Sequence, residues 1–216
     1  MAAKHLKKRA KPKVSERAAN KKWSPPDYSP KGLARMLARM APKEIANYNE
    51  GVAKHRLAKL KELRSLLRDK KVGPLLLDLE TRGVARKFAR LPFGCICDSC
   101  AGHLMDEPIM GERIALEKIG PNQKVFATGA DFELALDFSP QAMEFRKALE
   151  EFDKRVPFAR VTWGGSLSYV SVPINPSKKF GKRDAVEIRK LNLRFLEEFE
   201  KLVDGFAKKY GVRVKL

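Results

Sequence analysis

The sequence predicts an α+β protein with three parts: a basic helical region, a compact Cys/His metal loop, and a ferredoxin-like antiparallel sheet with two helices. Three observations support this prediction. Apolar residues recur at helical spacing in the first third, strand-like alternation marks the last third, and all cysteines lie between the two. The predicted units are a basic extended tail (1–31), a basic αα-hairpin (32–72), a metal-loop region (73–123) and the ferredoxin-like domain (124–216).

Composition limits the class of protein. The 216 residues carry 45 Lys+Arg against 26 Asp+Glu, a net charge of +19, and 44% are hydrophobic, which is ordinary for a globular chain. No apolar run approaches the ~18 residues that span a bilayer, and the longest, at 75–77, ends at Asp78. Lysines replace the apolar core of a signal peptide, so we expect neither a membrane partner nor secretion. Three cysteines without an export signal predict reduced thiols in a cytoplasmic compartment.

The positive charge is concentrated in the first third of the chain. Residues 1–72 hold 21 basic and 6 acidic side chains, whereas residues 73–216 hold 24 and 20. Like charges at such density remain extended and repel unless a polyanion neutralises them. We therefore expect the tail to lie on nucleic-acid phosphates, and a solubilising tail or an import signal is the alternative. The tail contacts expected are Lys7, Lys8, Arg9, Lys11 and Lys13.

Two helices are predicted after the tail. Ser29 followed by Pro30 is typical of an N-cap with proline in the first turn, and Pro42 begins a second, longer helix ending near Gly73. Apolar residues occupy one side of the second helix and cations the others, which predicts a hairpin with a basic back. An ordinary solvated helix face is the alternative. The nucleic-acid contacts expected there are Lys54, Lys61, Arg64 and Arg68.

The most specific pattern is a group of thiols and one imidazole within nine residues: Cys95, Cys97, Cys100 and His103. These are the ligands that tetrahedral zinc prefers, and four of them close a structural site. The spacing is shorter than in a typical zinc finger, so one ligand can come from elsewhere, with Asp98, Asp106 and His55 as candidates. Thiols without a metal, and iron–sulfur or redox chemistry, are the alternatives.

Arginines recur every four residues just before these cysteines. If residues 79–90 are helical, Arg82, Arg86 and Arg90 form one basic stripe leading into the metal loop. We expect this stripe to contact a nucleic-acid backbone, because a metal can fix a short segment that has little core of its own. Pairing of these arginines with Glu80 and the acids of 106–117 is the alternative.

The last third predicts the order β-α-β-β-α-β, which is the ferredoxin-like arrangement. The predicted strands are 132–138, 158–163, 166–172 and 212–216, preceded by a short strand at 125–128. Ser139 is expected to begin the first helix, Asp184 is expected to be the N-cap of the second, and Gly211 is expected to follow the second as its C′ glycine. Such a fold hosts many functions and decides none of them.

Two features of this unit bear on phosphate binding: the strand register and the loop before the last helix. The hairpin should set Arg160 opposite Tyr169, but Glu133 and Asp137 are expected on the same face, so we expect no phosphate binding there. The loop before the last helix holds four cations, one aromatic residue and no acid, at a helix N-terminus that favours anions. We expect its cations to bind phosphate while the ring stacks, and a solvated connector is the alternative. These residues are Lys178, Lys179, Phe180, Lys182 and Arg183.

Together these features predict a nucleic-acid-binding protein stapled by structural Zn²⁺, with RNA favoured over DNA. We expect a component or factor of a ribonucleoprotein particle such as the ribosome. The sequence contains no GxSxG, HExxH, P-loop or glycine-rich nucleotide motif. We therefore assign no catalytic residue and favour a protein that is not an enzyme. The alternatives are a metal-dependent hydrolase or nucleic-acid-processing enzyme using His103, and an adaptor that docks through the helices of 32–72.

Overall fold

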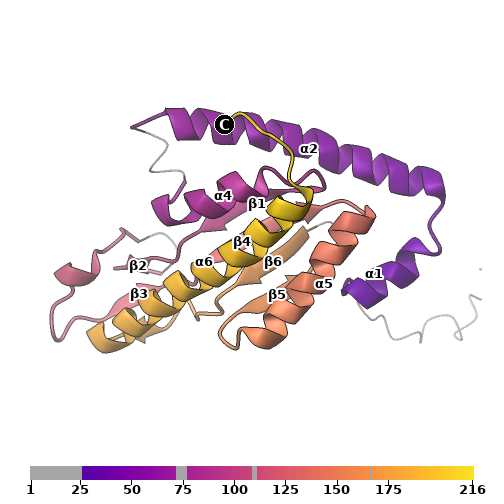
Figure 1. Ribbon diagram of the computed structural model, residues 1–216. Coiled ribbons are helices and arrows are strands. Elements are labelled where there is room, and N and C mark those ends of the chain that lie inside the picture. The colour runs from indigo at the N-terminus through magenta and orange to yellow at the C-terminus, as the bar shows by residue number, and fades with distance from the viewer. Residues whose placement is uncertain (1–25, 72–76, 109–110, 166) are drawn as a thin grey trace, which may run out of the picture.

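The computed structural model describes residues 26–71, 77–108, 111–165 and 167–216. It confirms the α+β class, with antiparallel sheets and five α-helices in the described ranges (Figure 1). The helices are α1 (Pro30–Leu37), α2 (Pro42–Arg68), α4 (Arg82–Phe88), α5 (Pro140–Arg155) and α6 (Lys182–Tyr210). Two short 3-10 helices are η2 (Leu79–Thr81) and η3 (Leu116–Lys118).

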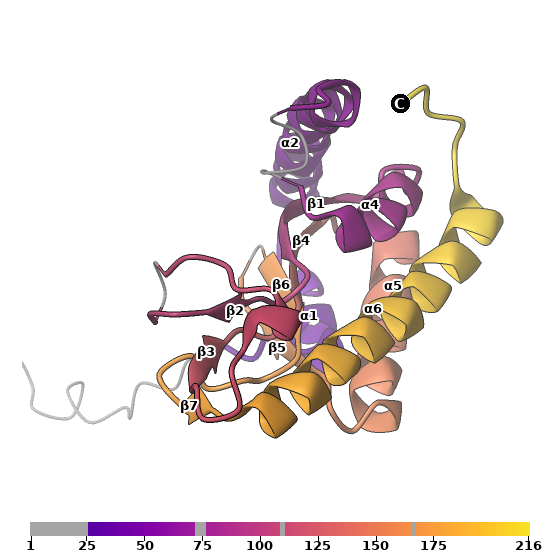
Figure 2. The same cartoon turned by 90° about the vertical axis from the view of Figure 1, so that its left-hand side faces the viewer.

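The strands form two antiparallel sheets. The main sheet has the order β1-β4-β6-β5, with β1 (Gly94–Cys100), β4 (Asp131–Leu136), β6 (Leu167–Ser171) and β5 (Arg160–Trp163). The small sheet has the order β2-β3-β7, with β2 (Leu104–Met105), β3 (Val125–Ala127) and β7 (Lys179–Phe180). Figure 2 shows α4, α5 and α6 on one side of the main sheet.

An aromatic core lies between these helices and the main sheet. Phe199 of α6 is fully buried, and its ring centroid lies 4.7 Å from that of Phe132 on β4 and 5.9 Å from that of Phe152 on α5. The same core includes Phe88 of α4 and Phe93, which lie before residue 124. One core therefore joins residues on both sides of the predicted boundary between 73–123 and 124–216.

Local signals place most helix ends where the sequence predicts them. The Ser29 and Ser139 hydroxyls accept hydrogen bonds from the amides of Gly32 and Ala142, which confirms both as N-caps. Gly211 follows the last residue of α6, as predicted, but its φ of −66° is not the left-handed conformation of a C′ glycine. The N-cap of α6 was predicted incorrectly: Gly181, and not Asp184, is the N-cap, and the helix begins at Lys182.

The fourth strand of the main sheet also differs from the prediction. Residues 211–216 form no strand, so a ferredoxin-like order with a C-terminal strand is not confirmed. The edge beside β4 is taken instead by β1, which the sequence analysis treats as a metal loop. The C-terminal segment cannot reach that edge, because the Val212 amide donates to the Arg90 carbonyl and Arg64 of α2 donates to the Lys215 carbonyl.

The first two helices do not form the predicted hairpin. α1 packs against α5, whereas α2 runs along β1 (Figure 1). α2 is fastened at the end of β4 by Tyr48, whose ring stacks on Phe138 with the centroids 4.0 Å apart. The Phe138 amide also donates a 2.8 Å hydrogen bond to the Asn49 carboxamide. These contacts hold α2 against the sheet and away from α1.

The face of the main sheet opposite the aromatic core is acidic. Glu133 lies on this face, as expected, and pairs with Tyr169 of β6. The predicted pairing of Tyr169 with Arg160 is wrong, because Tyr169 pairs with Thr162 on β5 and Arg160 pairs with Ser171. Burial raises the pKa of Asp131 on this face to about 6, and the charges of Asp98 and Glu133 reinforce the shift. Carboxylates repel phosphate, and the expectation that phosphate does not bind this face stays a prediction.

None of the described helices combines the length and apolar composition needed to cross a bilayer.

Asn192 of α6 holds the short connection between β3 and β4, and this side chain is 2% exposed. Its carboxamide accepts a 2.9 Å hydrogen bond from the Ala130 amide and donates one of 3.1 Å to the Thr128 carbonyl.

Candidate functional site

The structure divides the four predicted metal ligands between two groups. Cys95 and Cys97 lie with His55, and Cys100 and His103 lie with Asp78; in each group the potential ligand atoms are within 4.8 Å of one another. Cys95 pairs with Ala135 and Cys100 with Asp131, four residues further along β4. An extended strand separates such positions by roughly 13 Å. The structure therefore does not bring the four residues to one point, and zinc binding stays a prediction.

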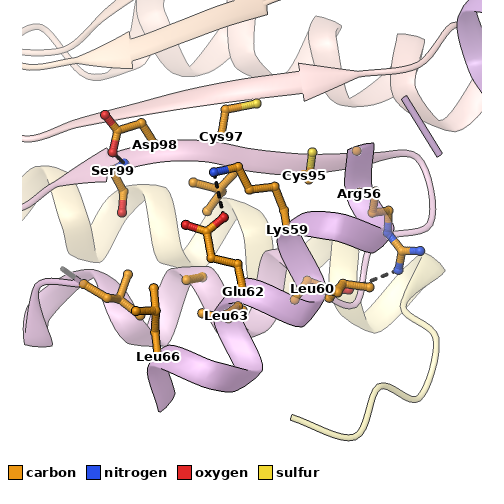
Figure 3. Close-up of a pocket in the computed structure, with 15 residues that line it drawn as sticks. Arg56, Lys59, Leu60, Glu62, Leu63, Leu66, Cys95, Cys97, Asp98 and Ser99 are labelled. Carbon is orange, nitrogen blue, oxygen red and sulfur yellow. Dashed lines mark hydrogen bonds and ion pairs between the residues drawn. The ribbon is translucent and has the colours of Figure 1, made fainter. Parts of the chain in front are cut away.

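The first group joins α2 to β1. The His55 Nε2 atom on α2 lies 3.4 Å from the Cys97 Sγ atom on β1. The strand register shifts between Ile96 and Asp98, so Cys97 sits at a β-bulge. Bulges redirect side chains and are common at functional sites. Figure 3 shows both cysteines on β1, with the Lys59 side chain extending from α2 toward Cys97.

The two thiols of this group differ strongly in acidity. A hydrogen bond from the Cys95 thiol lowers the pKa of Cys97, and the contact with His55 lowers it as well; together they outweigh burial and bring the pKa to about 6. The pKa of Cys95 is raised because its thiol makes that hydrogen bond and is buried. These contacts favour the thiolate form of Cys97, which is the form of cysteine that binds metals and reacts as a nucleophile.

A small pocket of about 90 Å³ opens beside the two cysteines, between α2, α4 and β1. Arg56 and Lys59 line it from the α2 side (Figure 3). Arg56 donates hydrogen bonds to the carbonyls of Leu91 (2.8 Å) and Ala89 (3.1 Å), so this turn of α2 is fixed on the chain leading into β1. Lys59 forms an ion pair with Glu62 at 2.9 Å.

The second group is a buried ion-pair network around Asp78, which is 7% exposed. Its carboxylate accepts hydrogen bonds from His103 Nε2 (3.0 Å), Arg113 Nη1 (2.8 Å) and the Ala101 amide (2.8 Å). Burial alone would raise the pKa of Asp78, but these partners outweigh burial and hold the pKa well below its usual range. The hydrogen bond to Asp78, followed by one with Cys100, raises the pKa of His103 to about 9.

A tight turn brings His103 to Asp78. Gly102 has a φ of 77°, in the left-handed region, and a Cβ at this position would lie 2.0 Å from the Asn192 carboxamide nitrogen. The charged His103 is engaged by Asp78, so a role as general base, on which the hydrolase alternative depends, would require breaking this ion pair.

Replacement of His103 by Gln is expected to remove a pH-dependent part of the stability. Because folding raises the pKa of His103 from 6.5 to about 9, its contribution is complete below about pH 6.5 and is lost as the pH rises through 9. The difference in unfolding free energy between wild type and His103→Gln should therefore shrink by roughly 2 to 3 kcal/mol between about pH 6 and pH 10. Urea denaturation at several pH values measures it, and a constant difference would show that His103 and Asp78 are not coupled.

Comparison with known proteins assigns the chain to no family. No protein-family model matches the chain, and no curated protein sequence does so either. Among solved structures, the PH1069 protein from Pyrococcus horikoshii is similar over 80% of this chain and 100% of its own, with 12% identity and a TM-score of 0.49. A hypothetical protein from Aeropyrum pernix is similar over 62% of this chain and 96% of its own, with 17% identity and a TM-score of 0.33. Both TM-scores are below 0.5, so neither structure bears on the function.

The predicted nucleic-acid contacts on α2 lie together. Lys54, Lys61 and Arg68 are exposed, and Arg64 is half-exposed. The helix turns by about 100° per residue, so these four positions fall within an arc of roughly 80°. We call this set the α2 basic stripe. The predicted tail contacts Lys7, Lys8, Arg9, Lys11 and Lys13 lie outside the described residues.

The arginines before β1 do not form the single stripe that was predicted. α4 spans only Arg82–Phe88, and Arg90 lies beyond its end. Arg86 and Arg90 are exposed, but Arg82 is half-buried, and two of its guanidinium nitrogens are buried without a hydrogen-bond partner among the described residues. The alternative pairing with Glu80 is not seen either, because Glu80 pairs with Arg189.

The predicted 178–183 loop is largely structured. Phe180 belongs to β7 and is 8% exposed, packed in a second core under the start of α6, so its ring is not presented for stacking. Lys182 donates a 2.7 Å hydrogen bond to the Ile119 carbonyl. Lys178, Lys179 and Arg183 are exposed, although the Lys179 ammonium lies over the Phe126 ring. Lys182 is exposed as well, so the loop keeps four of the five predicted contacts at the surface and only Phe180 is buried.

Sequence reasoning missed Asp78 and Arg113, which hold the second group together. Asp78 lies 25 residues before His103 and is marked in the sequence only as the end of an apolar run. No spacing rule links it to His103, because the contact depends on how β1 enters the sheet. His55 was a distant candidate ligand, and only the position of α2 along β1 shows that it reaches Cys97.

Proposed function

We propose that this protein binds RNA through its basic tail and the α2 basic stripe, as a component or factor of a ribonucleoprotein particle such as the ribosome. The observation that carries the proposal is the alignment of Lys54, Lys61, Arg64 and Arg68 along one exposed side of α2. At 1.5 Å per residue the stripe is about 21 Å long, enough to follow several phosphates. Phosphate contacts of this kind supply most of the affinity of non-specific binding.

The surroundings of the stripe favour an anionic partner. A surface hollow of about 500 Å³ lies at its C-terminal half and is lined by Lys61, Arg64 and Arg68, with Ser65 and Asp69. Lys54 pairs with Glu50 at 2.7 Å, but both side chains are more than 60% exposed, and such surface pairs are weak. A polyphosphate backbone can therefore displace that pair at small cost.

We also interpret β4, α5, β5, β6 and α6 as a ferredoxin-like unit in which β1 takes the place of the missing C-terminal strand. The strand order is consistent with this interpretation, because β1 lies antiparallel beside β4 at the position where the C-terminal strand was expected. Glu133 and Asp131 occupy the face of the sheet opposite the aromatic core. The proposed RNA surface is therefore α2 and the tail, and it excludes that sheet face.

Neutralising two cations of the stripe should weaken RNA binding and reduce its salt dependence. We expect the double replacement Lys61→Ala and Arg68→Ala to reduce the slope of log K against log salt by about 1.4 to 1.8, since each lost phosphate contact contributes roughly 0.7 to 0.9. Fluorescence anisotropy with a structured RNA across a salt series measures the slope.

The matched control for this experiment replaces Lys147 and Lys190, which are exposed on α5 and α6 and change the net charge equally. The control should leave the slope close to that of wild type. Equal losses for the two double variants would mean that net charge alone drives binding and would remove α2 from the proposed surface.

A further inference from the structure

We propose that His55, Cys95 and Cys97 bind one zinc ion, which fastens α2 to β1. The ligand set is an imidazole nitrogen and two thiolate sulfurs, a combination typical of zinc sites. It differs from the set predicted from the sequence, because Cys100 and His103 are replaced by one residue from a distant helix. This proposal does not depend on RNA binding.

The geometry is close to that of a zinc site. Zn–S bonds of about 2.3 Å and Zn–N bonds of about 2.0 to 2.1 Å at tetrahedral angles place ligand atoms roughly 3.5 to 3.8 Å apart. The Nε2 atom of His55 lies 3.4 Å from the Sγ atom of Cys97. All three ligand atoms lie within 4.8 Å of one another, so small side-chain rotations complete the arrangement.

The protein positions the ligands through contacts that do not involve the metal. Alternation along β1 puts Cys95 and Cys97 on the same side of the strand, and one of them is on the bulge. Arg56, the neighbour of His55, is held to the chain before β1 by two hydrogen bonds. Tyr48 and Asn49 fix α2 two turns earlier on Phe138. His55 is therefore held opposite the thiols by the packing of α2 itself.

The second group is a poorer metal site. Both oxygens of Asp78 already accept hydrogen bonds, from Arg113 on one and from His103 and Ala101 on the other. A cation there would have to displace the Arg113 guanidinium and the His103 ring. In the first group, Cys97 contacts the His55 ring, which is itself a proposed ligand, and the nearby Lys59 is paired with Glu62.

The site supplies three protein ligands and leaves a fourth position. Within the described residues no fourth His, Cys, Asp or Glu side chain belongs to this group. The adjoining pocket of about 90 Å³ is large enough for a water, which occupies about 30 Å³ in the liquid. Arg56 and Lys59 line that pocket, so a small anion is equally suited to complete the coordination.

Zinc binding by the full chain tests the proposal. Equilibrium dialysis against Zn²⁺ should give one ion per chain, and X-ray absorption of the zinc-loaded protein should show two sulfur ligands at about 2.3 Å together with nitrogen or oxygen ligands at about 2.0 to 2.1 Å. His55→Gln and Cys97→Ser should each weaken binding on the order of 100-fold or more. Failure of wild type to retain zinc, or a zinc shell without sulfur, would overturn the proposal.

Two control variants separate this site from the compact loop predicted from the sequence. Cys100→Ser and His103→Gln remove the corresponding residues of the second group and should leave zinc affinity unchanged. If they weaken binding as much as Cys97→Ser does, the ligands are those of the compact loop and the proposed set is wrong. His55 is exposed on α2, so His55→Gln should fold even if a cysteine variant does not. Zinc should raise the melting temperature of wild type and leave that of His55→Gln unchanged.

Discussion

Replacement of Phe199 by Ala is expected to lower the free energy of unfolding by about 3 to 5 kcal/mol. Phe199 is fully buried at the centre of the core, where its ring contacts Phe132 of β4 and Phe152 of α5. Truncation removes the contacts of α6 with both the sheet and the neighbouring helix and leaves a cavity that the surrounding rings cannot fill. The change is large compared with the 5 to 15 kcal/mol that stabilise an ordinary domain.

Urea denaturation measures this loss, and Leu193→Ala is the matched control on the same helix. Leu193 is 38% exposed, so its truncation should cost well under half as much. Phe199→Leu should fall between the two, because it keeps most of the apolar volume. Similar losses for Phe199→Ala and Leu193→Ala would show that α6 does not pack on the main sheet as described.

The predictable part of the fold is the part governed by local signals. The caps at Ser29 and Ser139 and the strand-like alternation in β4 each depend on residues close together in sequence, and the structure confirms them. Such signals act through backbone hydrogen bonds and through the period of the side chains, which differs between helices and strands.

The parts that sequence reasoning missed depend on long-range pairing. β1 is a seven-residue strand rich in small and polar residues, GCICDSC, and only its pairing with β4 identifies it as an edge of the sheet. Because β1 pairs with that side of β4, the segment after Gly211 does not take the position predicted for it. The prediction that the cysteines lie in one compact loop is wrong for the same reason. They lie along an extended strand, which separates Cys95 from Cys100.

In the candidate site, too, local patterns could be predicted and long-range contacts could not. Cys97 and its neighbours were recognised because their residue types are rare and clustered, whereas His55 and Asp78 reach them only through the placement of α2 and of the chain before η2. The surface cations of α2 could be predicted, because helical periodicity alone puts them on one side. The burial of Phe180 could not be predicted, because it depends on the small sheet that β7 forms with β3.

RNA binding is tested most directly by deleting residues 2–25 from the full chain and measuring affinity for a structured RNA between 50 and 200 mM salt. Residues 1–25 carry nine cations and one acid, and the deletion leaves every described residue in place. We expect full-length protein to lose about 10³-fold or more in affinity across this range, as proteins that contact six or more phosphates do. The deletion should weaken binding at 50 mM salt and make the salt dependence much shallower. An affinity of the full chain that does not change with salt, or a slope that the deletion leaves unaltered, would contradict RNA binding through the tail.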